Sequence, residues 1–255
     1  MMNQFSGSFW SAVIFYTRLP LPASWTKCWQ RIARWASLIG LILGLVMGFT
    51  HRILLQLGFT PLVSGAVITG LWLGATGGLH LDGAMDSADG LAVTDPQKRL
   101  EVMRDSATGA FGAMVAIVIL LLKAVTISDM TQSSWLLLML AMGWSRWGQL
   151  IAIALYPYLR ATGKGAFHKE HLSIYADISL SSLIVFLGSC SGVLLGVISW
   201  GQLFGAVGGC SVIAISTGYY FYRQLGGHTG DTYGAVVEWS EVFSLLFLSV
   251  YLPLN

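Results

Sequence analysis

Charged side chains are scarce in this sequence. Only 10% of its 255 residues are Asp, Glu, Lys or Arg, whereas 55% are hydrophobic and the mean hydropathy is +0.69. Soluble domains carry about 25% charged residues, so this composition is too poor in charge to cover the surface of one. We therefore expect a protein that lies in a membrane.

Cysteine is also rare, and its pattern excludes two kinds of site. Cys28, Cys190 and Cys210 form no CxxC pair, and two of them lie within apolar runs. We therefore expect neither a disulfide framework nor a thiolate metal site. The N-terminus lacks the basic start and the small-residue cleavage site of a signal peptide, so we expect it to belong to the mature protein. No long repeat or linker divides the chain, which predicts a single integral-membrane domain over residues 1–255.

Apolar runs predict an all-α fold, a polytopic transmembrane helical bundle with about seven spans. The expected spans cover residues 35–57, 60–79, 109–125, 134–156, 180–198, 201–222 and the chain from 239 onward. The apolar run from Phe5 to Tyr16 is too short to cross a hydrocarbon core of about 30 Å, so we expect an interfacial helix there. Glycine recurs at every fourth position in several spans, a pattern that lets transmembrane backbones approach closely.

The basic residues predict an orientation. With seven spans, the Lys and Arg before the first span and those near residues 98–104, 160–169 and 223 fall on one side. The opposite connections carry almost none, so the positive-inside rule makes the shared side the cytoplasm. We expect a multi-pass protein of the cell inner membrane, with a cytoplasmic N-terminus and an active site at the cytoplasmic face.

Half of the acidic residues lie between positions 80 and 112. Asp82, Asp86 and Asp89 are spaced by four and three, so their carboxylates share one face if residues 81–91 are helical. No Lys or Arg lies among them, and unpaired charge beside hydrocarbon is costly. Hard oxygen ligands suit Mg²⁺. We therefore predict a magnesium site here, in preference to a solvated loop face.

The segment from Gly226 to Gly234 forms a second polar group. It sets a His, an Asp and two Thr between glycines, so its backbone N–H groups can approach an anionic ligand closely. It is expected on the same side of the membrane as the acidic stretch. We predict that the two segments meet, and that Asp231 helps to hold Mg²⁺ or a diphosphate.

Other polar residues are candidates with structural alternatives. Arg146 lies within an apolar span, where an Arg is rare, so an anion contact is favoured. His80 is a candidate general base or an interface residue, and Asp105 a candidate ligand contact or a helix cap. His168 and His171 look first like part of a solvated, charged loop.

Three motifs together resemble the cobalamin synthase family, the adenosylcobinamide-GDP ribazoletransferases: GGLHLDGAMDSADGL, LEVMRDSATGAFG and LGGHTGDTYGAVVEWSE. The resemblance runs nearly end to end. It implies a Mg²⁺-dependent inner-membrane transferase that joins α-ribazole, or its 5′-phosphate, to adenosylcobinamide-GDP and releases GMP. The product would be adenosylcobalamin or its 5′-phosphate. The implied partners are these substrates and membrane lipid, with no nucleic acid and with homo-oligomerisation left open.

The family motifs and the chemistry of the residues together assign roles. The catalytic candidates are His80, Asp82 and Asp86. The metal candidates are Asp82, Asp86, Asp89 and Asp231. The substrate-binding candidates are Arg104, Asp105, Ser106, Arg146, His228, Thr229 and Gly230. The chain departs from the family at Ala107, where an Arg is usual, so any phosphate contact of that Arg is lost or passes to Arg104.

Two other functions stay open on the residues alone. A CDP-alcohol phosphotransferase of lipid synthesis also uses spaced aspartates on a transmembrane helix, but its motif expects Ala-Arg where Met85 and Asp86 stand. A cation-coupled transporter also places carboxylates near a membrane. Against a transporter, the carboxylates here lie in loops on one face and no inverted repeat is visible.

Overall fold

The computed structural model describes residues 4–26, 28–105, 107–130 and 134–252, and these ranges contain helices but no strand. The helices are α1 (Gln4–Tyr16), α2 (Ala36–Gln56), α3 (Pro61–Thr76), α4 (Leu79–Ala92), α5 (Arg99–Val102), α6 (Ala110–Ser128), α7 (Ser134–Leu155), α8 (Lys164–His171), α9 (Ile174–Leu194), α10 (Trp200–Leu225) and α11 (Gly230–Tyr251). Two short 3-10 turns, η1 (Ala23–Trp25) and η2 (Ile32–Trp35), lie between α1 and α2.

The described chain has 6 helices long and apolar enough to cross a membrane, and the bent pair of α3 and α4 raises the number to 7. The predicted all-α bundle is therefore confirmed. Its last span begins at Gly230, well before residue 239. The reason is a cap, since the Thr229 hydroxyl accepts a hydrogen bond from the Thr232 N–H and starts α11 inside the glycine-rich segment.

Two glycines break the second span. Gly77 and Gly78 adopt left-handed backbone angles, with φ of 63° and 69°, a conformation that glycine reaches without steric cost. The chain turns there by 91° from α3 into α4. The acidic stretch therefore begins as a helix that crosses the bundle, and its three aspartates lie on that helix as their spacing predicted.

The centre of the bundle is α7, which is buried along almost its whole length. Helices α2, α9, α10 and α11 pack around it. Gly44 lets α2 approach, because a Cβ at this position would lie 2.5 Å from the carbonyl oxygen of Leu138. The glycines of α3 differ, since Gly70 and Gly74 face no other described residue within 4 Å. Close helix packing thus explains part of the glycine pattern, but not all of it.

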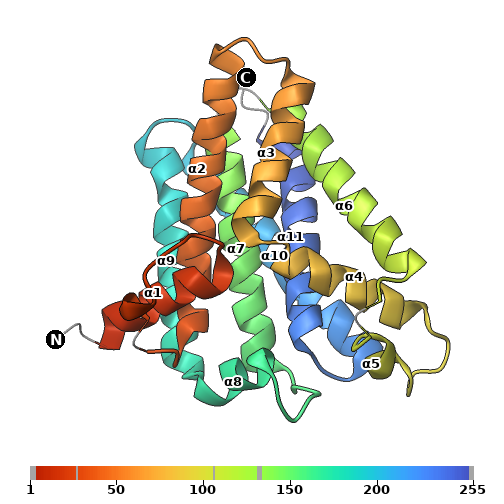
Figure 1. The fold of residues 1–255 in the computed structure, drawn as a ribbon. Helices are drawn as coiled ribbons and strands as arrows, with labels where there is room; N and C mark the ends of the chain where they lie inside the picture. The colour runs from red at the N-terminus through yellow and green to blue at the C-terminus, as the bar shows by residue number, and fades with distance from the viewer. Residues whose placement is uncertain (1–3, 27, 106, 131–133, 253–255) are drawn as a thin grey trace.

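The polar connections gather at one end of the bundle (Figure 1). Helices α4, α5 and α8 and the turn from α10 to α11 lie at the lower end, whereas the turn from α2 to α3 lies at the upper end. Helix α1 lies across the bundle beside the lower part of α2. The basic connections therefore share one end, as the loop charges predicted. The compartment that this end faces stays a prediction.

Candidate active site

Helix α4 and the first turns of α11 are in backbone contact. A Cβ at Gly83 would lie 2.5 Å from the carbonyl oxygen of Asp231, and a Cβ at Gly234 would lie 2.9 Å from that of His80. Neither position can accept a side chain without moving the partner helix. The predicted meeting of the acidic stretch with the glycine-rich segment is confirmed.

This contact gathers carboxylates at the polar end of the bundle. Asp86 lies within electrostatic range of three other aspartates: Asp82, Asp89 and Asp231. Asp82 is exposed and Asp86 is half-buried. Among the residues that the structure describes, no hydrogen bond or ion pair engages the carboxylate of Asp82 or of Asp86. Their mutual repulsion therefore has no direct counter-charge.

Arg160 neutralises one member of the group. Its guanidinium, from the connection between α7 and α8, donates to the Asp231 carboxylate at 2.6 Å and to the Met103 carbonyl oxygen at 3.2 Å. The Thr229 hydroxyl also donates to Asp231, at 3.3 Å. The sequence offered no signal for this residue, because Arg160 is one of several cations in a polar loop. Asp82 and Asp86 remain without such a partner.

Asp89 is engaged by another helix. Its carboxylate accepts hydrogen bonds from the backbone N–H groups of Gly109 and Gly112, both at 2.8 Å. These groups belong to the N-terminus of α6, where a carboxylate is favourable and where Gly109 itself has no side chain to contribute. Asp105, the candidate cap, instead accepts from the N–H of Ala107 at 3.0 Å. The cap of α6 is therefore Asp89.

The carboxylates do not form a closed metal cage. Within the described ranges, no three His, Cys, Asp or Glu side chains are arranged to hold a metal ion. Mg²⁺ rarely uses such a cage, because it takes one or two carboxylates and completes its octahedron with water and substrate phosphate. Asp82 and Asp86, with Asp231 alongside, match the first part of that set. The residues present thus fit a Mg²⁺ that arrives together with a phosphate ligand.

A cavity of about 270 Å³ opens beside these carboxylates. The residues around it come from α1, α4, α7, α8, α11 and the connection before α8. The sequence candidates among them are His80, Asp82, Gly230 and Asp231, and Arg160 lies beside them. The cavity therefore joins the two polar segments in one concave site, which we call the acidic cavity.

His80 lies in the wall of the acidic cavity. It is only 2% exposed, and neither ring nitrogen has a hydrogen-bond partner in the described part of the chain. Its ring stacks on Tyr16 at 6.2 Å. An unpaired buried imidazole requires an explanation, and a ligand in the cavity would provide one.

His228 is a support of the site rather than part of its surface. It is fully buried, with Nδ1 at 3.0 Å from the Thr232 hydroxyl. The ring centroids of Tyr156 and Tyr233 each lie 5.3 Å from the ring centroid of His228. Burial lowers the pKa of His228 to about 4, so the ring is neutral at physiological pH. Its contacts fix the turn that places Thr229 and Gly230.

The remaining candidates are dispersed. Arg104 is exposed at the end of α5, and Ser106 lies outside the described residues. Arg146 lies inside the bundle, where its Nη1 donates to Glu241 at 2.6 Å and to the Met142 carbonyl oxygen at 3.0 Å. The structure thus brings His80, Asp82, Asp86, Gly230 and Asp231 together, whereas Arg146 lies within electrostatic range of His80 but pairs with Glu241.

Arg146 belongs to a buried ion network. Lys123 of α6 donates to Glu238 at 2.7 Å and to Glu241 at 2.6 Å, and Glu241 also accepts from Arg146. All four side chains are almost fully buried. The early start of α11 carries both glutamates into the bundle. The network links α6, α7 and α11. No spacing pattern in the sequence indicated it, because its members are far apart in the chain.

His168 contradicts the expectation of a solvated loop. It is 8% exposed, and its ring meets Phe15 edge to face at 4.8 Å. The expectation is wrong because α1 lies over α8, a contact between segments that are distant in sequence. Burial lowers the pKa of His168 to about 4. His171 is less enclosed, and its Nδ1 lies 3.0 Å from the Phe167 carbonyl oxygen.

Together these features define a polytopic membrane protein with a carboxylate-rich site at one end of its helices. The family profile of cobalamin-5-phosphate synthase matches residues 8–249. The chain therefore belongs to the cobalamin-5-phosphate synthase family; it is an enzyme, a transferase of cobalamin biosynthesis.

Relatives over nearly the full length support this membership. An adenosylcobinamide-GDP ribazoletransferase from Synechocystis sp. is 53% identical over 244 residues, covering 94% of this chain and 93% of the relative. The protein of that name from Trichormus variabilis is 49% identical, covering 94% and 95%. The one from Brevibacillus brevis is 36% identical, covering 94% and 97%. No solved structure matches the chain.

Proposed function

We propose that this enzyme joins α-ribazole, or its 5′-phosphate, to adenosylcobinamide-GDP with release of GMP, and that it needs Mg²⁺. The activity name that the relatives share supplies the two substrates. In the reaction an acceptor oxygen attacks the phosphorus on the cobinamide side of the diphosphate. The bond to GMP breaks, GMP leaves with the bridging oxygen, and the acceptor gives up its proton where the attacking group is a hydroxyl.

The observation that carries the proposal is the unbalanced charge of the acidic cavity. Within the described residues Asp82 and Asp86 have no ion-pair partner, and Arg160, which pairs with Asp231, acts on Asp86 only from a distance. A diphosphate is an anion, so these carboxylates alone would repel it. A divalent cation held by Asp82 and Asp86, with Asp231 alongside, would remove the conflict, and when bound it would neutralise the charge that develops on the departing phosphate.

The chain's own residues would bind and orient the substrates. His80, with both ring nitrogens unpaired in the cavity wall, is the proposed proton acceptor for a hydroxyl nucleophile. Arg160 lines the cavity and can share its guanidinium between Asp231 and a phosphate oxygen. It is better situated for this contact than Arg146, whose guanidinium Glu241 holds at 2.6 Å.

The proposal also includes an orientation, with the acidic cavity in the cytoplasm. The basic connections support it through the positive-inside rule. Gln97 follows α4 in an exposed loop, so Gln97→Cys should resist a membrane-impermeant thiol reagent applied to intact cells and react after the membrane is opened. Labelling in intact cells would reverse the orientation.

An assay of GMP release tests the proposed reaction. Purified protein should release GMP only when adenosylcobinamide-GDP, α-ribazole or its phosphate, and Mg²⁺ are all present, and EDTA should stop release until Mg²⁺ is restored. Asp86→Asn should abolish release. The matched control is Asp95→Asn, because Asp95 is an exposed carboxylate that only accepts a loop hydrogen bond from the Gln97 N–H. GMP release without the acceptor, or undiminished release in the presence of EDTA, would contradict the proposal.

A further inference from the structure

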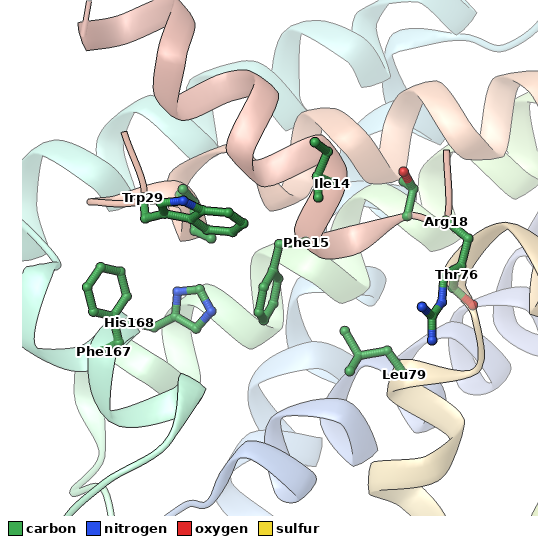
Figure 2. A pocket seen from close by; sticks show the side chains of 10 residues that line it. Ile14, Phe15, Arg18, Trp29, Thr76, Leu79, Phe167 and His168 are labelled. Atoms are coloured by element: carbon green, nitrogen blue, oxygen red, sulfur yellow. The ribbon is translucent and has the colours of Figure 1, made fainter. Parts of the chain in front are cut away.

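A second cavity, of about 510 Å³, lies beneath α1. Its walls come from α1, the segment before η2, the end of α3 and α8, and Figure 2 shows its side chains. Binding sites for small molecules typically measure about 300–1,000 Å³. We call it the aromatic cavity, after Phe15, Trp29 and Phe167 in its wall.

The aromatic cavity adjoins the acidic cavity. Phe15, Leu79 and His168 line both. Leu79 directly precedes His80, so the two cavities meet beside the residues of the proposed reaction. This position distinguishes the aromatic cavity from the apolar groove between α4, α6, α10 and α11, which shares none of the candidate residues described above.

His168 supplies a polar atom inside the aromatic wall. Its Nε2 is buried and has no partner among the residues that the structure describes. Figure 2 shows its ring between those of Phe167 and Phe15, with the Trp29 indole above. Leaving a buried nitrogen without a hydrogen bond is unfavourable. A ligand atom that pairs with Nε2 would recover that energy.

The wall selects for a flat and uncharged group. Trp29 is 44% exposed and Phe167 is half-buried, so both keep ring surface that a planar ligand can cover. Because burial lowers the pKa of His168 to about 4, its neutral imidazole can pair with a neutral heteroaromatic nitrogen. Arg18 and Thr76 stand in the opposite part of the wall, toward the start of α4.

We propose that Trp29, Phe167 and His168 form the subsite for the heteroaromatic base of the acceptor nucleoside. The subsite rests on the proposed function, which makes the acceptor a nucleoside or its phosphate. With the donor's diphosphate at the carboxylates, a base held here directs its ribose toward the wall that the two cavities share. The attacking oxygen then approaches the diphosphate from the side of Leu79 and His80.

Kinetics with both substrates test this subsite. Trp29→Ala and Phe167→Ala should each raise the KM for α-ribazole by about tenfold, the effect of losing one strong stacking contact. His168→Phe keeps a ring and removes the nitrogens, so it should raise this KM by about fivefold. The KM for adenosylcobinamide-GDP should stay within about twofold of the wild type.

The matched control is Phe204→Ala. Phe204 is an aromatic residue of α10 that is 60% exposed and lies outside both cavities. It should leave both KM values unchanged. A rise in the KM for adenosylcobinamide-GDP in the cavity variants would assign the cavity to the corrinoid substrate and overturn the proposal. Unchanged values for both substrates would leave the cavity to lipid and overturn it as well.

A binding measurement separates this proposal from the proposed function. Equilibrium dialysis of α-ribazole should detect binding to the full-length wild type and to inactive Asp82→Asn, and weaker binding to Trp29→Ala. Failure of the reaction would appear as absence of GMP release from the wild type under all conditions. Failure of the subsite alone would appear as normal turnover together with equal α-ribazole affinity in wild type and Trp29→Ala.

Discussion

The acidic cavity and the buried ion network place similar side chains in opposite electrostatic situations. In the network, Lys123 and Arg146 face Glu238 and Glu241, and each contact is 2.6 or 2.7 Å long. Its formal charges cancel. At the acidic cavity, Asp82 and Asp231 line the wall and Asp86 lies nearby, and in the described part of the chain one ion pair, from Arg160 to Asp231, is formed among them.

The difference indicates what each region does. A buried charge inside a membrane bundle must be compensated within the protein, because neither lipid nor water can do it there. The network is compensated and therefore stabilises the packing of α6, α7 and α11. The acidic cavity is open to solvent and undercompensated, which is the condition of a site that binds a cation. Stability and activity should therefore respond separately to changes in the two regions.

The largest effect is expected in the acidic cavity and on activity alone. Asp82→Asn and Asp86→Asn should each lower turnover by at least about a thousandfold, or about 4 kcal/mol of activation free energy. They should leave the melting temperature unchanged or raised, because each removes like-charge repulsion. GMP release and thermal unfolding measure the two quantities. Near-normal turnover of either variant at ordinary Mg²⁺ would remove the metal assignment.

The second-largest effect is expected on the stability of the fold, when the ion network is changed. Glu241→Gln leaves Arg146 and Lys123 undercompensated, which should cost about 3–5 kcal/mol and reduce the yield of folded protein. The double variant Glu241→Met with Arg146→Met retains the pair of Lys123 and Glu238, so it should recover much of that loss. Unfolding in detergent by heat or denaturant gives the comparison. A stable double variant with a raised KM for adenosylcobinamide-GDP would assign Arg146 to substrate binding as well.

A smaller effect is expected at Asp231, whose carboxylate lines the acidic cavity and also forms an ion pair with Arg160. Asp231→Asn keeps the shape and removes the charge, so it should lower turnover by about 10- to 100-fold, the usual effect of disturbing a metal's surroundings. It should also raise the Mg²⁺ concentration needed for half-maximal GMP release. An unchanged Mg²⁺ requirement would make Asp231 a partner of Arg160 only.

The smallest effect is expected at the cap of α11. Thr232→Ala removes the hydroxyl that accepts from the Thr229 N–H at 2.8 Å and contacts His228. It should cost about 1 kcal/mol and lower the melting temperature by a few degrees, with both KM values unchanged. The matched control is Ser249→Ala, a half-buried position near the end of the same helix whose hydroxyl donates only to the Leu246 carbonyl oxygen, and it should have little effect. An equal response of both variants would mean that the cap contributes nothing.

Local patterns predicted the parts of this structure that depend on neighbouring residues. Apolar runs gave the bundle, and the spacing of Asp82, Asp86 and Asp89 gave one helix. The meeting of the two polar segments was also predicted, and Gly83 of α4 and Gly234 of α11 make that contact close. These predictions succeeded because helical periodicity and backbone freedom are encoded within a few residues. The approach of the glycine-rich backbone to an anionic ligand stays a prediction.

Other features depend on contacts between distant segments, and the sequence did not reveal them. Lys123 and Glu238 are paired although 115 positions separate them. Arg160 reaches Asp231 only because the connection before α8 folds back over α11. His168 is buried only because α1 covers α8. A polar residue in a loop looks solvated until the segment that packs on it is known.

The turn at Gly77 and Gly78 sets the depth of the proposed active site along the bundle. Helix α3 follows the bundle axis (Figure 1), and α4 leaves it at 91°. Had α4 continued along that axis, Asp82 and Asp89 would differ in depth by about 10 Å, from the helical rise of 1.5 Å per residue. Because α4 is turned sideways, the aspartates lie at a similar depth along the bundle axis. A diphosphate that reaches this depth would therefore approach all three aspartates at once.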